Sequence, residues 1–158
     1  MKLAIASDKA GFNLKQEVVE YLKNQGHEVI DVGLQNADGY MSFFNASDNL
    51  AKKITASEVE RGILICGTGA GMSINANRYK GIFAVACESI FAAKMCRIVN
   101  DANVMTMGAN IVGPGLAKDM CDVFLTTAFT QGMPPERAEY LKGLKKDYQS
   151  FLESRMGE

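Results

Sequence analysis

The residues best suited to chemistry lie in one short stretch, where an apolar run meets a cysteine and then three glycines. Residues 62–73 read G-I-L-I-C-G-T-G-A-G-M-S. An apolar run of this length, bounded by glycines, predicts a buried parallel strand that ends at Cys66. Gly67, Gly69 and Gly71 allow a sharp turn that exposes backbone N–H groups, and a helix can start after it. The sequence therefore predicts a thiol facing a helix N-terminus, where an anion is favoured.

Such a thiol could act as a base. A thiolate at Cys66 could abstract a proton from a carbon next to a carbonyl, while loop amides hold the developing enediolate oxygen. Thr68 could relay a proton between the two oxygens, or it could only hydrogen-bond within its own loop. The amides that could bind the substrate belong to Gly67, Gly69, Ala70 and Gly71.

Two familiar glycine-rich motifs are absent from this loop. The glycines do not follow the G-x-G-x-x-G dinucleotide fingerprint, and no G-K-[ST] follows them as in a P-loop. A dinucleotide-binding or regulatory module is therefore a remote alternative to an enzyme.

Composition and charge narrow the class of protein. The 158 residues are 47% hydrophobic and 22% charged, with a net charge of −1, as is typical of one globular domain spanning residues 1–158. We expect neither nucleic acid nor a membrane as a partner. The start of the chain predicts no signal peptide, which favours the cytoplasm.

Cysteine and histidine usage argues against a metal site. The chain has one histidine and no C-x-x-C pair, so we expect no metal and no cofactor. Away from the glycine loop, three cysteines are expected to be small buried apolar residues, namely Cys87, Cys96 and Cys121.

Short apolar runs alternate with amphipathic segments along the chain. Strands are predicted at Lys2–Ser7, Glu28–Val32, Gly62–Cys66, Ile82–Cys87 and Val104–Met107. Helices are predicted from Asn13 to about Asn24, from Asn45 or Ser47 to about Thr55, and at about Met72–Asn77, Ser89–Ile98, Pro114–Thr126 and Glu136–Leu152. Residues 35–44 are expected to form a loop. This order predicts an α/β fold, a Rossmann-like three-layer α/β/α sandwich with a five-stranded parallel sheet and an extended C-terminal helix.

Further candidate residues follow from this topology, because ligands bind at the carboxyl ends of such strands. Asp8 ends the first strand and could bind substrate hydroxyls or only stabilise a turn, and Lys9 adds positive charge beside it. Asn100 stands at a helix break, and Arg137 begins the last helix, where it could bind phosphate or be an ordinary surface charge. His27 precedes the second strand, at the wrong edge for catalysis, and is expected on the surface.

The last helix carries an apolar stripe with little left to cover. Leu141, Leu144, Tyr148 and Phe151 are spaced by three and four residues. We expect this helix, at about residues 136–152, to pack on a partner subunit rather than on its own domain.

Together these motifs resemble the type B ribose-5-phosphate isomerases, a family that includes the galactose-6-phosphate isomerase subunits. The central match is I-C-G-T-G-x-G-x-S-I-x-A-N at residues 65–77. It continues at residues 8–15 (D-x-x-G-x-x-L-K), 27–33 (H-E-V-I-D-V-G), 100–104 (N-D-A-N-V) and 107–113 (M-G-A-x-x-V-G). The resemblance implies a metal-free aldose–ketose isomerase that acts through an enediol. It also implies a homodimer or dimer of dimers in which two chains build each active site.

The resemblance also implies roles for single residues. Cys66 matches the proton-abstracting base, and Thr68 and its glycine loop match the enediolate-stabilising segment. Asp8 and Asn100 match positions that contact the sugar. Arg137 matches a phosphate-binding arginine that reaches the partner's site.

Several positions depart from the family's pattern. Lys9 stands where the family usually has a histidine, and Val99 stands where it has the histidine that opens the sugar ring. Asn110 and Met133 replace arginines, and residues 41–43 read M-S-F in place of Asp-Tyr-Pro. The isomerisation motif is thus kept, while ring opening and part of phosphate binding are altered.

These departures leave several substrates open. A four-carbon sugar 4-phosphate cannot close a furanose, because its O4 is esterified, and it would need no ring-opening base. The run F-F-N-A-S-D at residues 43–48 loosely resembles the family members that act on tetrulose phosphates. The alternatives are ribose 5-phosphate in its spontaneously opened form, a hexose 6-phosphate, and a subunit that needs a paralogous partner. A substrate that carries no phosphate, or whose anionic group is placed differently, is a further alternative.

Overall fold

A five-stranded parallel sheet forms the middle layer of the fold. The computed structural model describes residues 1–155. The strands are β1 (Lys2–Ser7), β2 (Glu28–Asp31), β3 (Arg61–Cys66), β4 (Ala84–Ala86) and β5 (Val104–Gly108), in the order β2-β1-β3-β5-β4. All neighbours are parallel. The carboxyl ends of β1, β3 and β5 therefore meet at one edge of the sheet.

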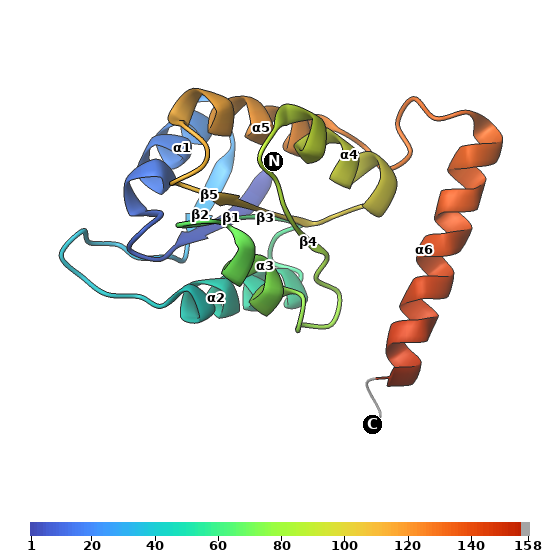
Figure 1. Cartoon of the computed structure of the whole chain (residues 1–158), viewed down its shortest axis with the longest axis horizontal. Helices are drawn as coiled ribbons and strands as arrows, with labels where there is room; N and C mark the ends of the chain where they lie inside the picture. The colour runs from blue at the N-terminus through green and yellow to red at the C-terminus, as the bar shows by residue number, and fades with distance from the viewer. Residues whose placement is uncertain (156–158) are drawn as a thin grey trace.

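Helices cover both faces of the sheet (Figure 1). One face carries α1 (Phe12–Asn24), α4 (Ile90–Asn100) and α5 (Pro114–Thr126), and the other carries α2 (Phe43–Thr55) and α3 (Ala70–Ala76). The last helix, α6 (Pro135–Arg155), stands at the side of the sandwich (Figure 1). The predicted three-layer α/β/α sandwich with an extended C-terminal helix is confirmed.

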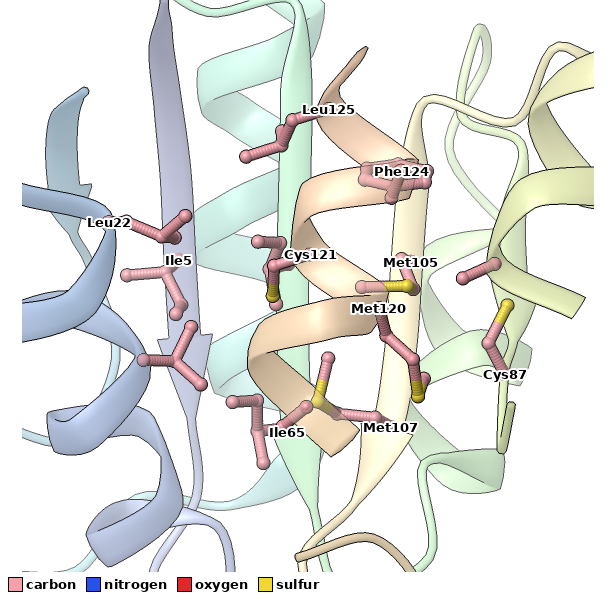
Figure 2. Close-up of a cluster of buried hydrophobic side chains, with 14 of the residues drawn as sticks. Ile5, Leu22, Ile65, Cys87, Met105, Met107, Met120, Cys121, Phe124 and Leu125 are labelled. Atoms are coloured by element: carbon pink, nitrogen blue, oxygen red, sulfur yellow. The ribbon is translucent and has the colours of Figure 1, made fainter. Parts of the chain in front are cut away.

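Strand side chains alternate between two cores, as the pleat requires. Figure 2 shows the larger core, in which Ile65 and Met107 from the sheet face Met120 and Phe124 from α5. The smaller core lies under α2 and α3 and includes Leu64 and Cys66. Cys66 therefore lies on the α2–α3 side of the sheet.

The cysteines outside the glycine loop behave as the sequence predicts. Cys87, Cys96 and Cys121 are buried free thiols. Burial raises the pKa of Cys121, which keeps its thiol neutral. These three residues are apolar core members.

Two helices start earlier than the sequence predicts. The N-cap of α1 is Gly11 and not Asn13. The N-cap of α2 is Ser42, whose Oγ accepts a hydrogen bond from the Asn45 N–H at 3.2 Å, so the predicted caps at Asn45 and Ser47 are wrong. The expected loop at residues 35–44 therefore ends before Phe43.

Other boundaries move by a few residues. The helix predicted from Met72 begins at Ala70, directly after the left-handed Gly69. The strand predicted at Ile82–Cys87 shrinks to Ala84–Ala86, and α4 extends to Asn100.

The apolar stripe of α6 is mostly uncovered. Leu141 is buried, whereas Leu144, Tyr148 and Phe151 are 49%, 49% and 51% exposed. Lys145 of α6 pairs with Asp101, which ties the helix to the end of α4. None of the helices within residues 1–155 is both long and apolar enough to cross a membrane.

Candidate active site

The thiol of Cys66 sits at the carboxyl edge of the sheet, in contact with the glycine loop. Its side chain is buried, and its Sγ accepts a hydrogen bond from the Gly69 N–H at 3.1 Å. A donor aimed at the sulfur stabilises negative charge on it. The structure therefore places the Cys66 sulfur against a backbone donor of the glycine loop.

Two glycines let this loop lie directly on the end of β5. Gly69 has φ +81°, and a Cβ there would stand 3.0 Å from the Met107 carbonyl carbon. A Cβ at Gly108 would come within 2.7 Å of the Thr68 Cα. The Thr106 hydroxyl also donates to the Gly69 carbonyl at 2.8 Å. The loop is thus fixed by β5 as well as by β3.

The turn after β1 lies against the same loop. A Cβ at Gly11 would overlap the Ile65 carbonyl oxygen at 2.2 Å, and a Cβ at Gly67 would stand 3.7 Å from the Ala10 Cβ. The structure therefore brings the turn that begins at Asp8 next to the Cys66 loop, as predicted.

Within that turn, the two candidate residues differ in their contacts. Asp8 Oδ1 accepts a hydrogen bond from the Gly11 N–H at 3.0 Å, so Asp8 does stabilise the turn. Lys9 is exposed on the same turn. Substrate contacts by Asp8 and Lys9 stay predictions.

Two more side chains border the loop. The Asn110 amide nitrogen lies 3.3 Å from the position of a Gly67 Cβ, and the Phe43 ring lies 3.3 Å from that of a Gly71 Cβ. In the sequence, Asn110 had stood out as a departure from the family pattern, and Phe43 both as a departure and as part of the 43–48 run. Their contacts with the loop join residues far apart in the chain, so no local signal could reveal them.

Asn100 is not brought to the thiol within one chain. The Gly62 N–H donates to the Asn103 carbonyl at 2.9 Å, so the segment after α4 lies beside the start of β3. Cys66 stands four residues further along β3, or about 13 Å away at the usual rise of a strand. Val99 precedes Asn100 at the same edge. A ligand held by both Cys66 and Asn100 would need a second chain.

Arg137 is also separated from the thiol. It is exposed at the start of α6, with its guanidinium carbon 5.1 Å from the Tyr140 ring centroid. Figure 1 shows the start of α6 beyond α4, and it is the later part of the helix that approaches the segment after α3, where Tyr148 lies near Phe83. The predicted substrate contact of Arg137 therefore also requires another copy of the chain.

The remaining candidates for metal or acid–base chemistry lie elsewhere or are not grouped. His27 is half-buried rather than on the surface as expected, and it lies at the amino edge of the sheet, just before β2. Within residues 1–155, no three His, Cys, Asp or Glu side chains are grouped to hold a metal ion.

Comparisons with known proteins find relatives that cover nearly the whole chain. The 4-deoxy-4-sulfo-D-erythrose isomerase of Clostridium sp. (strain MSTE9) is 47% identical over 98% of this chain and 97% of its own. The D-erythrulose-4-phosphate isomerase of Pectobacterium atrosepticum is 34% identical over 88% of this chain and 91% of its own. The solved structure of Clostridium thermocellum ribose-5-phosphate isomerase B has a TM-score of 0.80 and 38% identity, covering 94% of this chain and 99% of that one.

The family match covers most of the chain. The sequence profile described as Ribose/Galactose Isomerase matches residues 3–141, which include all five strands except Lys2 of β1, the glycine loop and the start of α6. The chain therefore belongs to the ribose/galactose isomerase family.

Proposed function

We propose that the protein is an aldose–ketose isomerase for an open-chain four-carbon sugar with an anionic group on C4. The observation that carries this proposal is the intact contact between the Cys66 sulfur and the Gly69 amide, in a chain with Val99 at the ring-opening position. The two curated relatives described above act, by their names, on four-carbon sugars. This combination supports both the proposed reaction type and the proposed substrate length.

The proposed reaction moves one proton between neighbouring carbons. The Cys66 thiolate removes the proton from the carbon next to the carbonyl, and the electron pair moves to the carbonyl oxygen to form an enediolate. The loop amides stabilise this oxygen. The Thr68 hydroxyl moves a proton between the two oxygens, and the thiol then returns a proton to the former carbonyl carbon. The reaction uses no metal.

An open chain explains why Val99 is tolerated. Closing a five-membered sugar ring needs a free hydroxyl on C4 of an aldose. In a sugar with a sulfonate or a phosphate ester on C4, that hydroxyl is replaced or blocked. The carbonyl is then already free, so an apolar side chain at Val99 removes no needed step.

A sulfonate is the C4 group that fits the altered charge of the site best. Asn110 and Met133 stand where the family has arginines, and each charge-assisted contact contributes about 1.5–3 kcal/mol. A sulfonate carries one negative charge at neutral pH, whereas a phosphate ester carries nearly two. Lys9 and a partner's copy of Arg137 would supply the remaining positive charge.

The proposed active unit is a homodimer or a dimer of dimers with shared sites. Asn100 and Arg137 lie away from Cys66 within one chain, and the exposed stripe of α6 offers an apolar surface for a second copy. Burying such a stripe between subunits would remove apolar area from water.

The experiment that tests the function compares substrates by length. We expect kcat/KM of the purified protein to be about 10–100-fold higher for 4-deoxy-4-sulfo-D-erythrose than for D-ribose 5-phosphate. D-Erythrose 4-phosphate should rank between them, and EDTA should change none of the rates. A higher kcat/KM for ribose 5-phosphate, or no turnover of any sugar by this chain alone, would overturn the proposal.

A further inference from the structure

The ring of Phe43 packs against the end of the glycine loop at Gly71. A Cβ at Gly71 would lie 3.3 Å from the ring atoms Cδ2 and Cε2 and 3.7 Å from Cγ. No other residue is among the three nearest atoms to that position. The ring thus rests on the first turn of α3, beside the amides proposed to hold the enediolate.

The first turn of α2 holds this ring in place. Besides the Ser42 cap, the Ser47 hydroxyl donates to the Phe43 carbonyl at 2.9 Å. Asn75 of α3 donates to the Ser47 hydroxyl at 2.7 Å and to the Phe44 carbonyl at 3.3 Å. These hydrogen bonds join the start of α2 to α3, so Phe43 keeps a fixed position relative to the loop.

Phe43 also lies on the side of the sheet where the sulfur lies. The Cys66 side chain belongs to the core under α2 and α3. Because α2 returns the chain to the start of β3, its first turn is at the carboxyl edge, where β3 ends. Phe43 as a residue is 41% exposed at that edge, so it touches the loop and also leaves surface open to a ligand.

We propose that Phe43 is a specificity-determining residue that limits the substrate to four carbons. This inference rests on the proposed function. Ring carbons offer no hydrogen-bond partner, so a substrate hydroxyl placed against them loses its bonds to water without replacement. A four-carbon sugar with a methylene at C4 presents an apolar group there, whereas a five-carbon chain presents a further hydroxyl at that position. The ring therefore favours the shorter substrate.

The test must separate chain length from ring opening. D-Ribulose 5-phosphate is suitable as the long substrate because its C5 oxygen is esterified, so it cannot form a furanose. The short substrate is 4-deoxy-4-sulfo-D-erythrulose. The measured quantity is the ratio of the two kcat/KM values in the direction from ketose to aldose, for the wild-type protein, Phe43→Ala, Phe43→Leu and Phe44→Ala.

We expect Phe43→Ala to shift this ratio at least about tenfold toward the five-carbon substrate, with a smaller shift for Phe43→Leu. Phe44 is the matched control, because this residue is 51% exposed and its ring packs edge-on against Phe43, with 5.5 Å between the ring centroids, yet none of its atoms is among the three nearest to a Gly71 Cβ. Phe44→Ala should leave the ratio within about twofold of wild type.

The outcomes separate this inference from the function on which it rests. If Phe43→Ala and Phe43→Leu lower kcat/KM equally for both substrates, the ratio is unchanged and the role of Phe43 is overturned. The proposed function would still stand, provided that the wild-type protein prefers the four-carbon substrate. A wild-type protein that prefers ribulose 5-phosphate would instead overturn the proposed function.

Discussion

Cys66 and Gly69 are the two residues on which the proposed chemistry depends most. The Gly69 N–H reaches the Cys66 sulfur because the loop turns back on itself at φ +81°. The sequence predicts a cysteine beside the backbone donors of this loop, because the glycines that follow it directly permit the turn. It does not predict the packing of Asn110 and Phe43 on the loop, which depends on tertiary structure.

A substitution at Gly69 should therefore affect both stability and activity. Gly69→Ala forces a side chain into the left-handed region and against the Met107 backbone. We expect a loss of about 2–4 kcal/mol in the free energy of unfolding and a large drop in kcat. Urea denaturation and steady-state kinetics measure the two effects.

Gly26 provides the matched control for this prediction. Its φ is +84°, nearly the same, but no atom lies within 4 Å of the position of its Cβ. Gly26→Ala should cost only about 1 kcal/mol and leave kcat unchanged. Equal effects of the two substitutions would show that the contact with β5 is unimportant.

At the level of elements, the order of strands and helices was predictable and the start of α2 was not. Short apolar runs, several of them bounded by glycines, identify all five strands, because a buried strand is nearly uniformly apolar. Ser42, Asn45 and Ser47 are all good N-caps within six residues, and local sequence does not rank them. The bonds from Asn75 engage Ser47 and the Phe44 carbonyl, which fixes the cap at Ser42.

The early start of α2 also changes how the site is understood. It turns a predicted loop residue, Phe43, into the first residue of a helix packed on Gly71. The resemblance had marked residues 41–43 as altered and had placed Phe43 in a run that loosely resembles the tetrulose-phosphate members, without saying where that residue lies. In the structure, this altered segment lies beside the proposed enediolate site.

At the level of the whole molecule, one chain carries only part of the predicted site. The parallel sheet separates Cys66 from Asn100 by most of the length of β3. α6 carries Arg137 to the side of the sandwich (Figure 1). The sequence predicts each motif, but it does not predict which motifs come together only when two copies of the chain associate.

Complementation tests whether two chains share each site. We expect Cys66→Ala and Asn100→Ala to be nearly inactive alone. A heterodimer of the two, isolated with different affinity tags, should regain about half of the wild-type activity, because one of its two sites is intact. The control pairs Cys66→Ala with Thr68→Ala, both in the same loop, and should regain none. An inactive Cys66–Asn100 heterodimer would show that the site is not shared.

The most direct test of the account is proton exchange with solvent in D₂O, followed by NMR. We predict that the wild-type protein, given 4-deoxy-4-sulfo-D-erythrulose, introduces deuterium at C1 of the ketose and at C2 of the aldose. Cys66→Ala should introduce none while keeping the wild-type circular dichroism spectrum, and Cys121→Ala, which removes a buried core thiol, should exchange normally. Deuterium incorporation by Cys66→Ala at a rate near that of wild type would contradict the account.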